Sequence, residues 1–161
     1  MKSFTLVSTA LIFAVTAQLN AQSRYLEELD SVYCLEIKSI DELRDSLMSL
    51  EPSQTSRFGY SNYGMKNTMD TCEYELDKLL NKYYQLLSKD LSTSAFLVVR
   101  DSQRRWLQFR ESYLKAYSET LPNVGTMWGL YFRGKRVELL EIRIGELFEI
   151  LRALVRIEDD Y

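Results

Sequence analysis

The chain has 161 residues, of which 46% are hydrophobic, with two prolines, six glycines and a formal net charge of −3. This composition argues against a disordered chain and against a turn-rich β-sandwich, while the length suits one domain with a hydrophobic core. A mildly acidic chain is also a poor candidate for binding nucleic acid, and it is compatible with a basic protein partner.

The first residues have the layout of a secretory signal peptide. Lys2 precedes an apolar run over residues 4–17, and small and polar residues follow that run. The run is too short to cross a membrane, and its flanks are those of a leader segment. We therefore predict an exported protein, periplasmic or secreted, in which residues 1–21 are removed and residues 22–161 form a single helical domain.

Two alternatives to this division remain open. The leader could instead be cleaved after Ala17, or the apolar segment could form the first helix of the mature fold. No cysteine lies near the cleavage region, which argues against a bacterial lipoprotein anchor, and no later stretch is apolar enough to span a bilayer. Loss of Lys2 with the leader changes the formal net charge from −3 to −4.

The first predicted helix of the domain covers residues 23–50 and ends before Pro52. Its apolar residues repeat at seven-residue intervals, which is typical of a helix packed along one seam, although Glu36 interrupts the pattern. The two rows of this seam are Leu26, Tyr33, Ile40 and Leu47, and Leu29, Leu43 and Leu50.

The connection that follows, residues 56–64, is a candidate for binding a partner. It combines aromatic residues and arginine with serine, glycine and asparagine. Binding loops use this mixture because aromatic rings supply contact area at low entropic cost and the small residues adapt. The alternative is a loop whose aromatic rings fold back over the end of the helices. The candidate partner-binding residues here are Arg57, Phe58, Tyr60 and Tyr63.

Three further helices are predicted over residues 65–89, 92–118 and 126–157, and the first residues of the third, Ser92 to Ser94, are good helix caps. Four helices with short connections and no alternating strand pattern predict an all-α fold, either a four-helix up-and-down bundle or extended helical hairpins. The residues expected to face inward are Met69, Cys72, Leu76, Leu79, Tyr83 and Leu86; Phe96, Val99, Gln103, Trp106, Phe109, Arg110, Tyr113 and Tyr117; and Leu140, Ile144, Leu147, Leu151 and Leu154.

The connection before the last helix, residues 121–128, supplies a second candidate surface for a partner, with Trp128 as its anchor. In an up-and-down bundle the first and third connections lie at the same end. We therefore expect the two candidate connections to form one surface.

Polar residues occupy positions on the predicted inward faces of the second and third helices. Asp77 and Asn81 are four residues apart, and Gln103 and Arg110 share a face of their helix. Because an unpaired buried charge is costly, we interpret these four residues as a polar clasp that joins the two helices, with Arg110 paired to Asp77. The alternative interpretation is a polar cleft that receives a ligand group.

The chain has two cysteines, Cys34 in the first predicted helix and Cys72 in the second. An even number of cysteines in an exported chain favours a disulfide, so we predict that Cys34 and Cys72 are joined. The alternative is two separate small core residues. A metal site is not predicted, because the chain has no histidine and two thiolates leave a tetrahedral centre half empty.

The motifs of the second and third helices resemble those of a known family. They read Met69-x-x-Cys72-x4-Asp77-x-x-Leu80-Asn81-x-x-Tyr84 and Gln103-x-x-Trp106-x-x-Phe109-Arg110. Over about residues 65–150 the chain is similar to the lysozyme inhibitor LprI-like N-terminal domain family of small, exported, helical bacterial proteins. The resemblance implies a protein that binds lysozyme. Gly125-Thr126 and Arg143 match a third family element loosely, and Leu114 and Lys135 stand where the family has further cysteines, so its disulfide pattern does not transfer.

Nothing in the sequence predicts catalysis. Without histidine the chain has no Ser-His-Asp or Cys-His arrangement, and it contains no glycine-rich phosphate loop. Asp77 with Glu73 or Glu75 is a possible carboxylate pair, but we interpret these acidic neighbours as a solvated helix face. We therefore predict that the protein is not an enzyme and has no cofactor.

Two functions from different classes remain. The resemblance implies an inhibitor of lysozyme, for which we expect an acidic patch or a protruding aromatic loop at one end of the bundle. The alternative is a structural or interaction module of the cell envelope that blocks no enzyme. This module would expose an apolar stripe along the first helix, formed by Leu26, Tyr33, Ile40 and Leu47.

Overall fold

The computed structural model describes residues 3–48, 62–120 and 127–157. It contains four helices, and the described residues include no strand, so the predicted all-α fold is confirmed. The helices are α1 (Ser3–Met48), α2 (Asn62–Asp90), α3 (Thr93–Thr120) and α4 (Trp128–Ile157). In the full chain α1 begins well before the predicted start at residue 23, because it continues through the predicted leader without a break.

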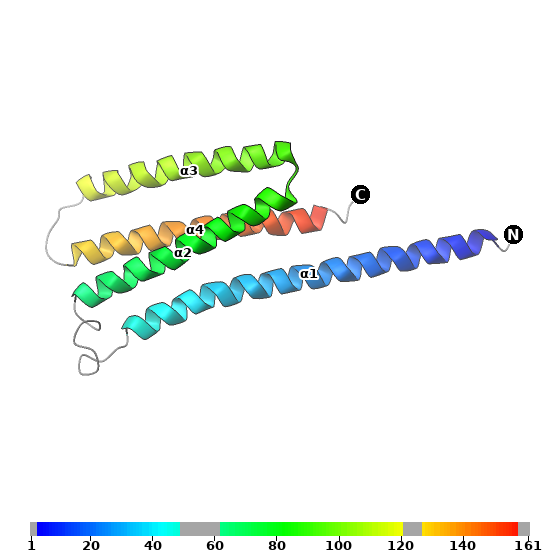
Figure 1. The fold of residues 1–161 in the computed structure, drawn as a ribbon, viewed down its shortest axis with the longest axis horizontal. Helices are drawn as coiled ribbons and strands as arrows, with labels where there is room; N and C mark the ends of the chain where they lie inside the picture. The colour runs from blue at the N-terminus through cyan, green and yellow to red at the C-terminus, as the bar shows by residue number, and fades with distance from the viewer. Residues whose placement is uncertain (1–2, 49–61, 121–126, 158–161) are drawn as a thin grey trace.

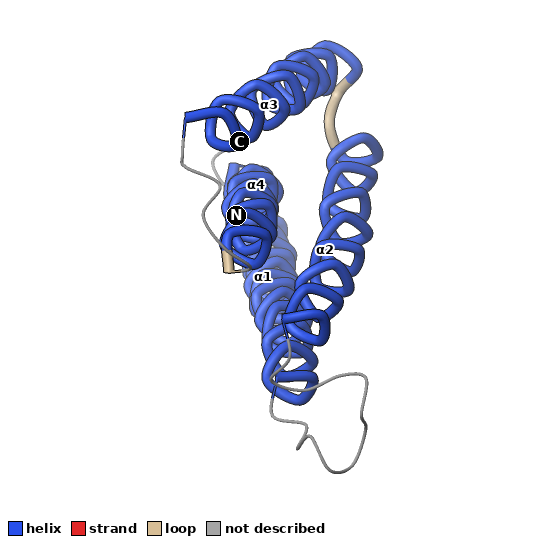
Figure 2. Tube along the Cα trace, turned by 90° about the vertical axis from the view of Figure 1, so that its left-hand side faces the viewer, coloured by secondary structure: helices blue, strands red, loops and turns tan. Residues whose placement is uncertain are grey.

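The helices run alternately up and down (Figure 1). The ends of α1 and α3 and the starts of α2 and α4 therefore lie at one end of the bundle, as predicted for the first and third connections. α2 and α4 are parallel neighbours, since Asp70 of α2 pairs with Arg133 of α4 and Glu73 pairs with Arg136. α1 runs along one side of this pair, and α3 returns along the outside of α2 and α4 (Figure 2).

The hydrophobic core lies mainly between α1, α2 and α4, and the apolar rows predicted for α2 and α4 point into it. Burying these side chains stabilises the fold by roughly 1.5–3 kcal/mol for each large aliphatic or aromatic residue. The buried apolar residues are Ile40, Cys72, Leu76, Leu79, Leu80, Tyr83, Leu87, Val99, Val137, Leu140, Ile144, Leu147, Phe148 and Leu151.

The seam of α1 packs inward. The ring of Tyr33 stacks on Phe148 with centroids 4.0 Å apart and meets Tyr83 edge-on at 5.9 Å. The hydroxyl of Tyr83 donates to Glu36 of α1 at 2.9 Å, so the glutamate that interrupts the seam has a partner across the helices. An envelope module was expected to expose Tyr33 and Ile40, and this expectation is wrong because both side chains pack against the core. The side chain of Leu47 lies outside the described residues.

Cys34 and Cys72 are both free thiols, which contradicts the predicted disulfide. The reason is the register of the antiparallel helices α1 and α2. Both Tyr33 and Glu36 contact Tyr83, so Cys34 lies level with Tyr83 rather than with Cys72. Eleven helical residues correspond to about 16 Å, whereas the Cα atoms of a disulfide are at most about 7 Å apart.

α3 begins at a cap that the sequence predicted. The hydroxyl of Ser92 accepts a hydrogen bond from the amide of Ala95 at 3.4 Å, and its carbonyl accepts from Phe96 at 2.9 Å. These contacts satisfy amides that the first turn of a helix leaves without a partner. Ser92 thereby fixes the turn between α2 and α3.

No helix in the described ranges has a stretch long and apolar enough to cross a membrane.

The two cysteines are expected to differ in reactivity. Cys34 is exposed, while Cys72 is fully buried and its burial raises the pKa of its thiol. We predict that a thiol reagent labels one cysteine in the native protein and two after unfolding, without any reductant. In Cys34→Ser the native signal is expected to disappear. Two thiols that become reactive only after reduction would contradict the free-thiol assignment.

Stability is expected to fall in alkaline solution. Burial raises the pKa of Tyr83 above its ordinary value of 10.0, and the hydrogen bond to Glu36 raises it further. Because the pKa is higher in the folded state, this stabilisation is complete below about pH 10 and is lost as the pH rises through the folded-state pKa.

Urea unfolding at pH 8 and pH 11 tests this expectation. The free energy of unfolding should decrease between the two, and the decrease should be smaller in Tyr83→Phe, which removes the titrating hydroxyl. An equal decrease in both proteins would show that Tyr83 is not the group responsible.

Candidate functional site

A buried carboxylate, Glu73, joins three helices. Its side chain is 10% exposed, and its Oε1 atom accepts a hydrogen bond from Arg110 of α3 at 2.9 Å and forms an ion pair with Arg136 of α4 at 2.7 Å. Charged hydrogen bonds of this kind are stronger than neutral ones. Glu73 also belongs to the inward face of α2, one residue after Cys72, so α2 holds it at the point where both guanidinium groups reach it.

Arg110 also pairs with Asp77, as predicted, but at a longer distance than with Glu73. The Oδ1 atom of Asp77 lies 3.5 Å from Nη1 of Arg110, and its side chain is 45% exposed. The interpretation of Glu73 as part of a solvated helix face is wrong. The sequence contained a signal for it, because Glu73 is four residues before Asp77 and shares the face of Met69 and Leu76.

The other two residues of the predicted clasp have different partners. Gln103 accepts a hydrogen bond from Nε of Arg143 on α4 at 2.9 Å, and Nη2 of Arg143 donates to Ser102 at 3.1 Å. Asn81 is exposed and donates to the backbone carbonyl of Asp77 on its own helix at 2.9 Å. Gln103 thus joins α3 to α4 rather than to α2.

Trp106 connects the two arginine clusters. The guanidinium carbons of Arg110 and Arg143 each lie 5.7 Å from the centroid of the Trp106 ring, a distance at which a cation is attracted to an aromatic face. Arg143 is itself buried and pairs with Glu146 at 2.7 Å. Long polar side chains around one tryptophan therefore join α3 to α2 and α4, beside the apolar contacts of Phe96 and Val99.

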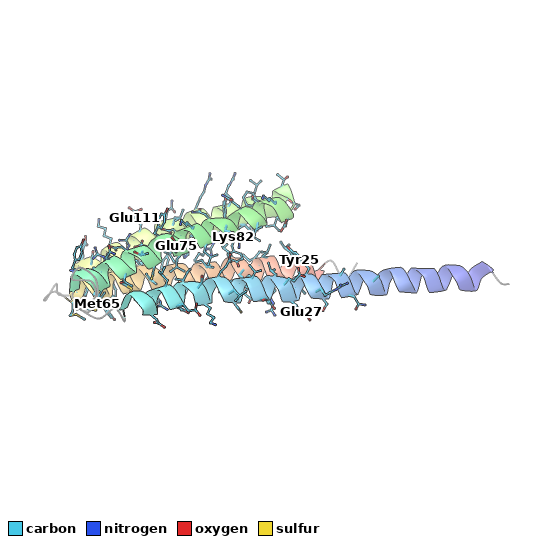
Figure 3. All side chains as sticks on the ribbon, turned by 60° about the horizontal axis from the view of Figure 1, so that its bottom comes forward. Tyr25, Glu27, Met65, Glu75, Lys82 and Glu111 are labelled. Carbon is cyan, nitrogen blue, oxygen red and sulfur yellow. The ribbon has the colours of Figure 1, made fainter. Side chains whose placement is uncertain are left out.

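An open groove runs between α2 and α3 beside these clusters. One part, of about 550 Å³, is lined by Asn81, Arg100 and Arg104. The other part, of about 560 Å³, extends to Phe132 of α4, and Asp77 borders both parts. The polar residues predicted as a clasp thus also line a cleft. On the other side of α2, Glu75 and Lys82 face a groove of about 500 Å³ above α1 (Figure 3).

The end of the bundle carries the described part of the predicted partner surface. Arg57, Phe58 and Tyr60 lie outside the described residues. Tyr63, in the first turn of α2, is 69% exposed. Trp128 is half-buried, because its ring stacks on Tyr117 of α3 with centroids 5.9 Å apart.

Two exposed residues next to Trp128 were not selected from the sequence. They are Met127 and Tyr131, which with Trp128 line a shallow hollow of about 350 Å³. Trp128, the predicted anchor, thus forms part of the floor of this hollow, and Met127 and Tyr131 are more exposed than Trp128. Met127 and Tyr131 are four residues apart, and this spacing could have indicated from the sequence that they lie on one face.

Aromatic rings continue from this hollow along α3. Phe109, Tyr113 and Tyr117 follow each other at four-residue intervals, with centroids 5.6 and 6.0 Å apart. Phe109 was expected to face inward, but it is exposed because it lies at the edge of the inward face of α3. A hydrogen bond with Tyr131 raises the pKa of Tyr117 to about 12, so the Tyr117 hydroxyl is neutral at physiological pH.

The described residues offer surfaces for binding. They contain no group of three or more His, Cys, Asp or Glu side chains that could hold a metal ion. The charged side chains of the site are paired with one another, as in Glu73 with Arg110 and Arg143 with Glu146. This arrangement suits a rigid helical support that presents exposed rings and an open groove.

Comparison with known proteins gives one family. The family model described as Lysozyme inhibitor LprI matches residues 53–147, which include α2, α3 and most of α4. Neither the search of curated proteins nor that of solved structures finds a match. The matched range contains both arginine clusters and the aromatic residues at the end of the bundle.

The two carboxylates beside Arg110 are expected to differ in their contribution to stability. We predict that Glu73→Gln lowers the free energy of unfolding by about 3–5 kcal/mol, because the largely buried guanidinium group of Arg110 loses its closest charged partner and the part-exposed one of Arg136 loses the same carboxylate. Asp77→Asn is the matched control, with an expected loss of about 0–1 kcal/mol because Asp77 is half exposed. Urea unfolding followed by circular dichroism measures both, and equal losses would contradict the central place of Glu73.

Proposed function

The chain belongs to the lysozyme inhibitor LprI family, and on that premise we propose that it is an exported protein that binds lysozyme and blocks it by contact, without catalysis. The observation that carries this proposal is the match over residues 53–147. In the structure that range is a helical support whose charged groups are internally paired. Such a support suits recognition by surface side chains, because binding then needs little rearrangement.

We place the lysozyme contact at the end of the bundle where α2 and α4 begin. Tyr63 and Met127 are exposed there, and Trp128 forms a floor between them and α3. Exposed aromatic residues in a well-supported patch are typical of binding hot spots. The proposed surface further includes Arg57, Phe58 and Tyr60 of the preceding connection. A formal charge of −4 after loss of the leader favours approach to a basic enzyme.

For localisation, we propose that residues 1–21 are a removable leader and that residues 22–161 act in the periplasm or outside the cell. The support for this proposal is the short basic start and the apolar run of the sequence. Family membership also favours export, since a lysozyme inhibitor must meet an enzyme that acts on the cell wall.

A second candidate is an interaction module of the cell envelope that inhibits no enzyme. One observation favours it: α1 exposes Tyr25, Val32 and Leu35 along a face that points away from the core. This face differs from the stripe that the sequence suggested. The same three residues would serve as contact points for another envelope protein.

Lysozyme activity tests the first function. The full chain, expressed for export and purified, is added in increasing amounts to lysozyme acting on cell-wall substrate at physiological salt. We expect saturable inhibition, and we expect Tyr63→Ala to weaken it by about tenfold, the loss of about 1–2 kcal/mol that a contact residue of this kind contributes.

The matched control is Tyr74→Ala, because Tyr74 is an equally exposed tyrosine of α2 that lies one helical turn past Asp70, away from the proposed surface. This variant should inhibit as well as the unchanged protein. Absence of inhibition at micromolar concentration, by protein that is folded and helical, would reject lysozyme as the target.

A further inference from the structure

The groove between α2 and α3 has an apolar floor that is open to solvent. Its first part is lined by Leu80 and Tyr84 of α2 and by Leu107 of α3, and Leu107 is 48% exposed. Leu114 of α3 and Phe132 of α4 continue the apolar lining in the second part. Because Leu107 borders both parts, the two hollows form one continuous groove.

α3 faces this groove with one stripe of side chains whose charge changes along the helix. Arg100, Arg104, Leu107 and Glu111 all line the groove, and they are spaced by four, three and four residues, which selects one side of a helix. The stripe is basic at its start, apolar in its middle and acidic at its end. Eleven helical residues from Arg100 to Glu111 correspond to about 16 Å.

The start of the groove has an excess of positive charge. Arg100 and Arg104 both pair with Asp101, at 3.4 and 3.9 Å, and Asp101 lies outside the lining of the groove. Two guanidinium groups thus share one carboxylate, and the side chain of Arg104 is 67% exposed. This end of the groove is therefore basic, although the chain as a whole has a formal net charge of −3.

The other end of the groove has an excess of negative charge. Its lining contains three carboxylates, those of Glu73, Asp77 and Glu111, and two guanidinium groups, those of Arg110 and Arg136. Glu73 pairs with both arginines, and Asp77 pairs more loosely with Arg110 at 3.5 Å. The exposed carboxylate of Glu111 adds the third negative charge at the rim.

These charges select the chemistry of an occupant. A ligand of one sign is attracted to one end of the groove and repelled by the other. A ligand that carries an anionic group, an apolar middle and a cationic group matches both ends and the floor. An extended peptide spans about 16 Å with about five residues, whereas a single amino acid reaches only one end.

We propose that the groove between α2 and α3 binds an extended segment of a partner protein, about five or six residues long, in which acidic, apolar and basic residues follow one another. The acidic residues lie against Arg100 and Arg104, the apolar ones against Leu107, and the basic ones against Asp77 and Glu111. This surface is separate from the end of the bundle, so the proposal does not depend on the binding of lysozyme.

Calorimetric titration with defined peptides tests the proposal in the absence of lysozyme. The purified full-length protein is expected to bind the capped peptide Glu-Glu-Leu-Leu-Lys-Lys saturably, and more weakly as the salt concentration rises. Replacing the two lysines of the peptide by glutamates, or its two glutamates by lysines, should each weaken binding by about tenfold, because one end of the groove then meets a like charge.

A charge reversal in the groove gives the matching test on the protein. Arg104→Glu should weaken binding of the mixed-charge peptide by about tenfold and strengthen binding of the all-basic peptide, Lys-Lys-Leu-Leu-Lys-Lys. Arg105→Glu is the matched control, because it makes the same change at the adjacent exposed residue outside the lining, and it should bind all peptides as the unchanged protein does. Circular dichroism verifies that both variants are folded.

Three results would overturn the proposal. The first is that the folded protein shows no saturable binding of the mixed-charge peptide at millimolar concentration. The second is that the mixed-charge, all-acidic and all-basic peptides bind with equal affinity. The third is that Arg104→Glu and Arg105→Glu change the affinities equally, which would indicate an effect of net charge rather than of the groove.

Discussion

The position of α3 depends on a carboxylate that two arginines share. Glu73 is buried on α2, and the guanidinium groups of Arg110 and Arg136 approach it from α3 and α4 at 2.9 and 2.7 Å. Glu73 and Arg110 can be buried together only because each has a charged partner, since an isolated charge would be too costly to remove from water. α1, α2 and α4 supply most of the apolar core, whereas α3 adds Val99 to it and is otherwise held by this polar contact and by the rings of Trp106 and Tyr117. The shared carboxylate therefore has a large part in fixing α3 against α2 and α4.

The sequence predicted the parts of the fold that follow from periodicity. Leu76 and Ile144 are buried because apolar residues at helical spacing share a face, and Ser92 caps α3 because its hydroxyl matches the free amides of a first turn. Which side chains pair between two helices could not be predicted from the spacing of residues within each helix. The sequence predicted the Arg110–Asp77 pair but missed Glu73 as the closer partner, and it joined Cys34 to Cys72. Neither the rotation of α3 nor the register of α1 against α2 is encoded in local spacing. Those two quantities are set by packing across the whole bundle.

For the candidate site, the sequence likewise identified the residues that matter but not all of their contacts. Arg110 was identified as an inward residue that pairs with α2, and it does so, although Glu73 is closer to it than Asp77. Gln103 was also identified as inward, but its partner is Arg143 of α4. Trp128 was expected to be an anchor, and it became a half-buried floor because Tyr117 stacks on it across the end of the bundle. The chain belongs to the lysozyme inhibitor LprI family over residues 53–147, and in that range the structure has internally paired charges and aromatic rings at the surface.

The most direct test of this account is a distance measurement between α1 and α3. The native Cys34 is exposed and Cys72 is buried, so a spin label on Cys34 and a second on Ser112→Cys report the separation of the two helices. Electron paramagnetic resonance should give one narrow distance distribution for this protein and a broad one when Glu73→Gln is added under conditions where the helices remain folded. The same narrow distribution in both proteins would contradict the claim that Glu73 holds α3 in place.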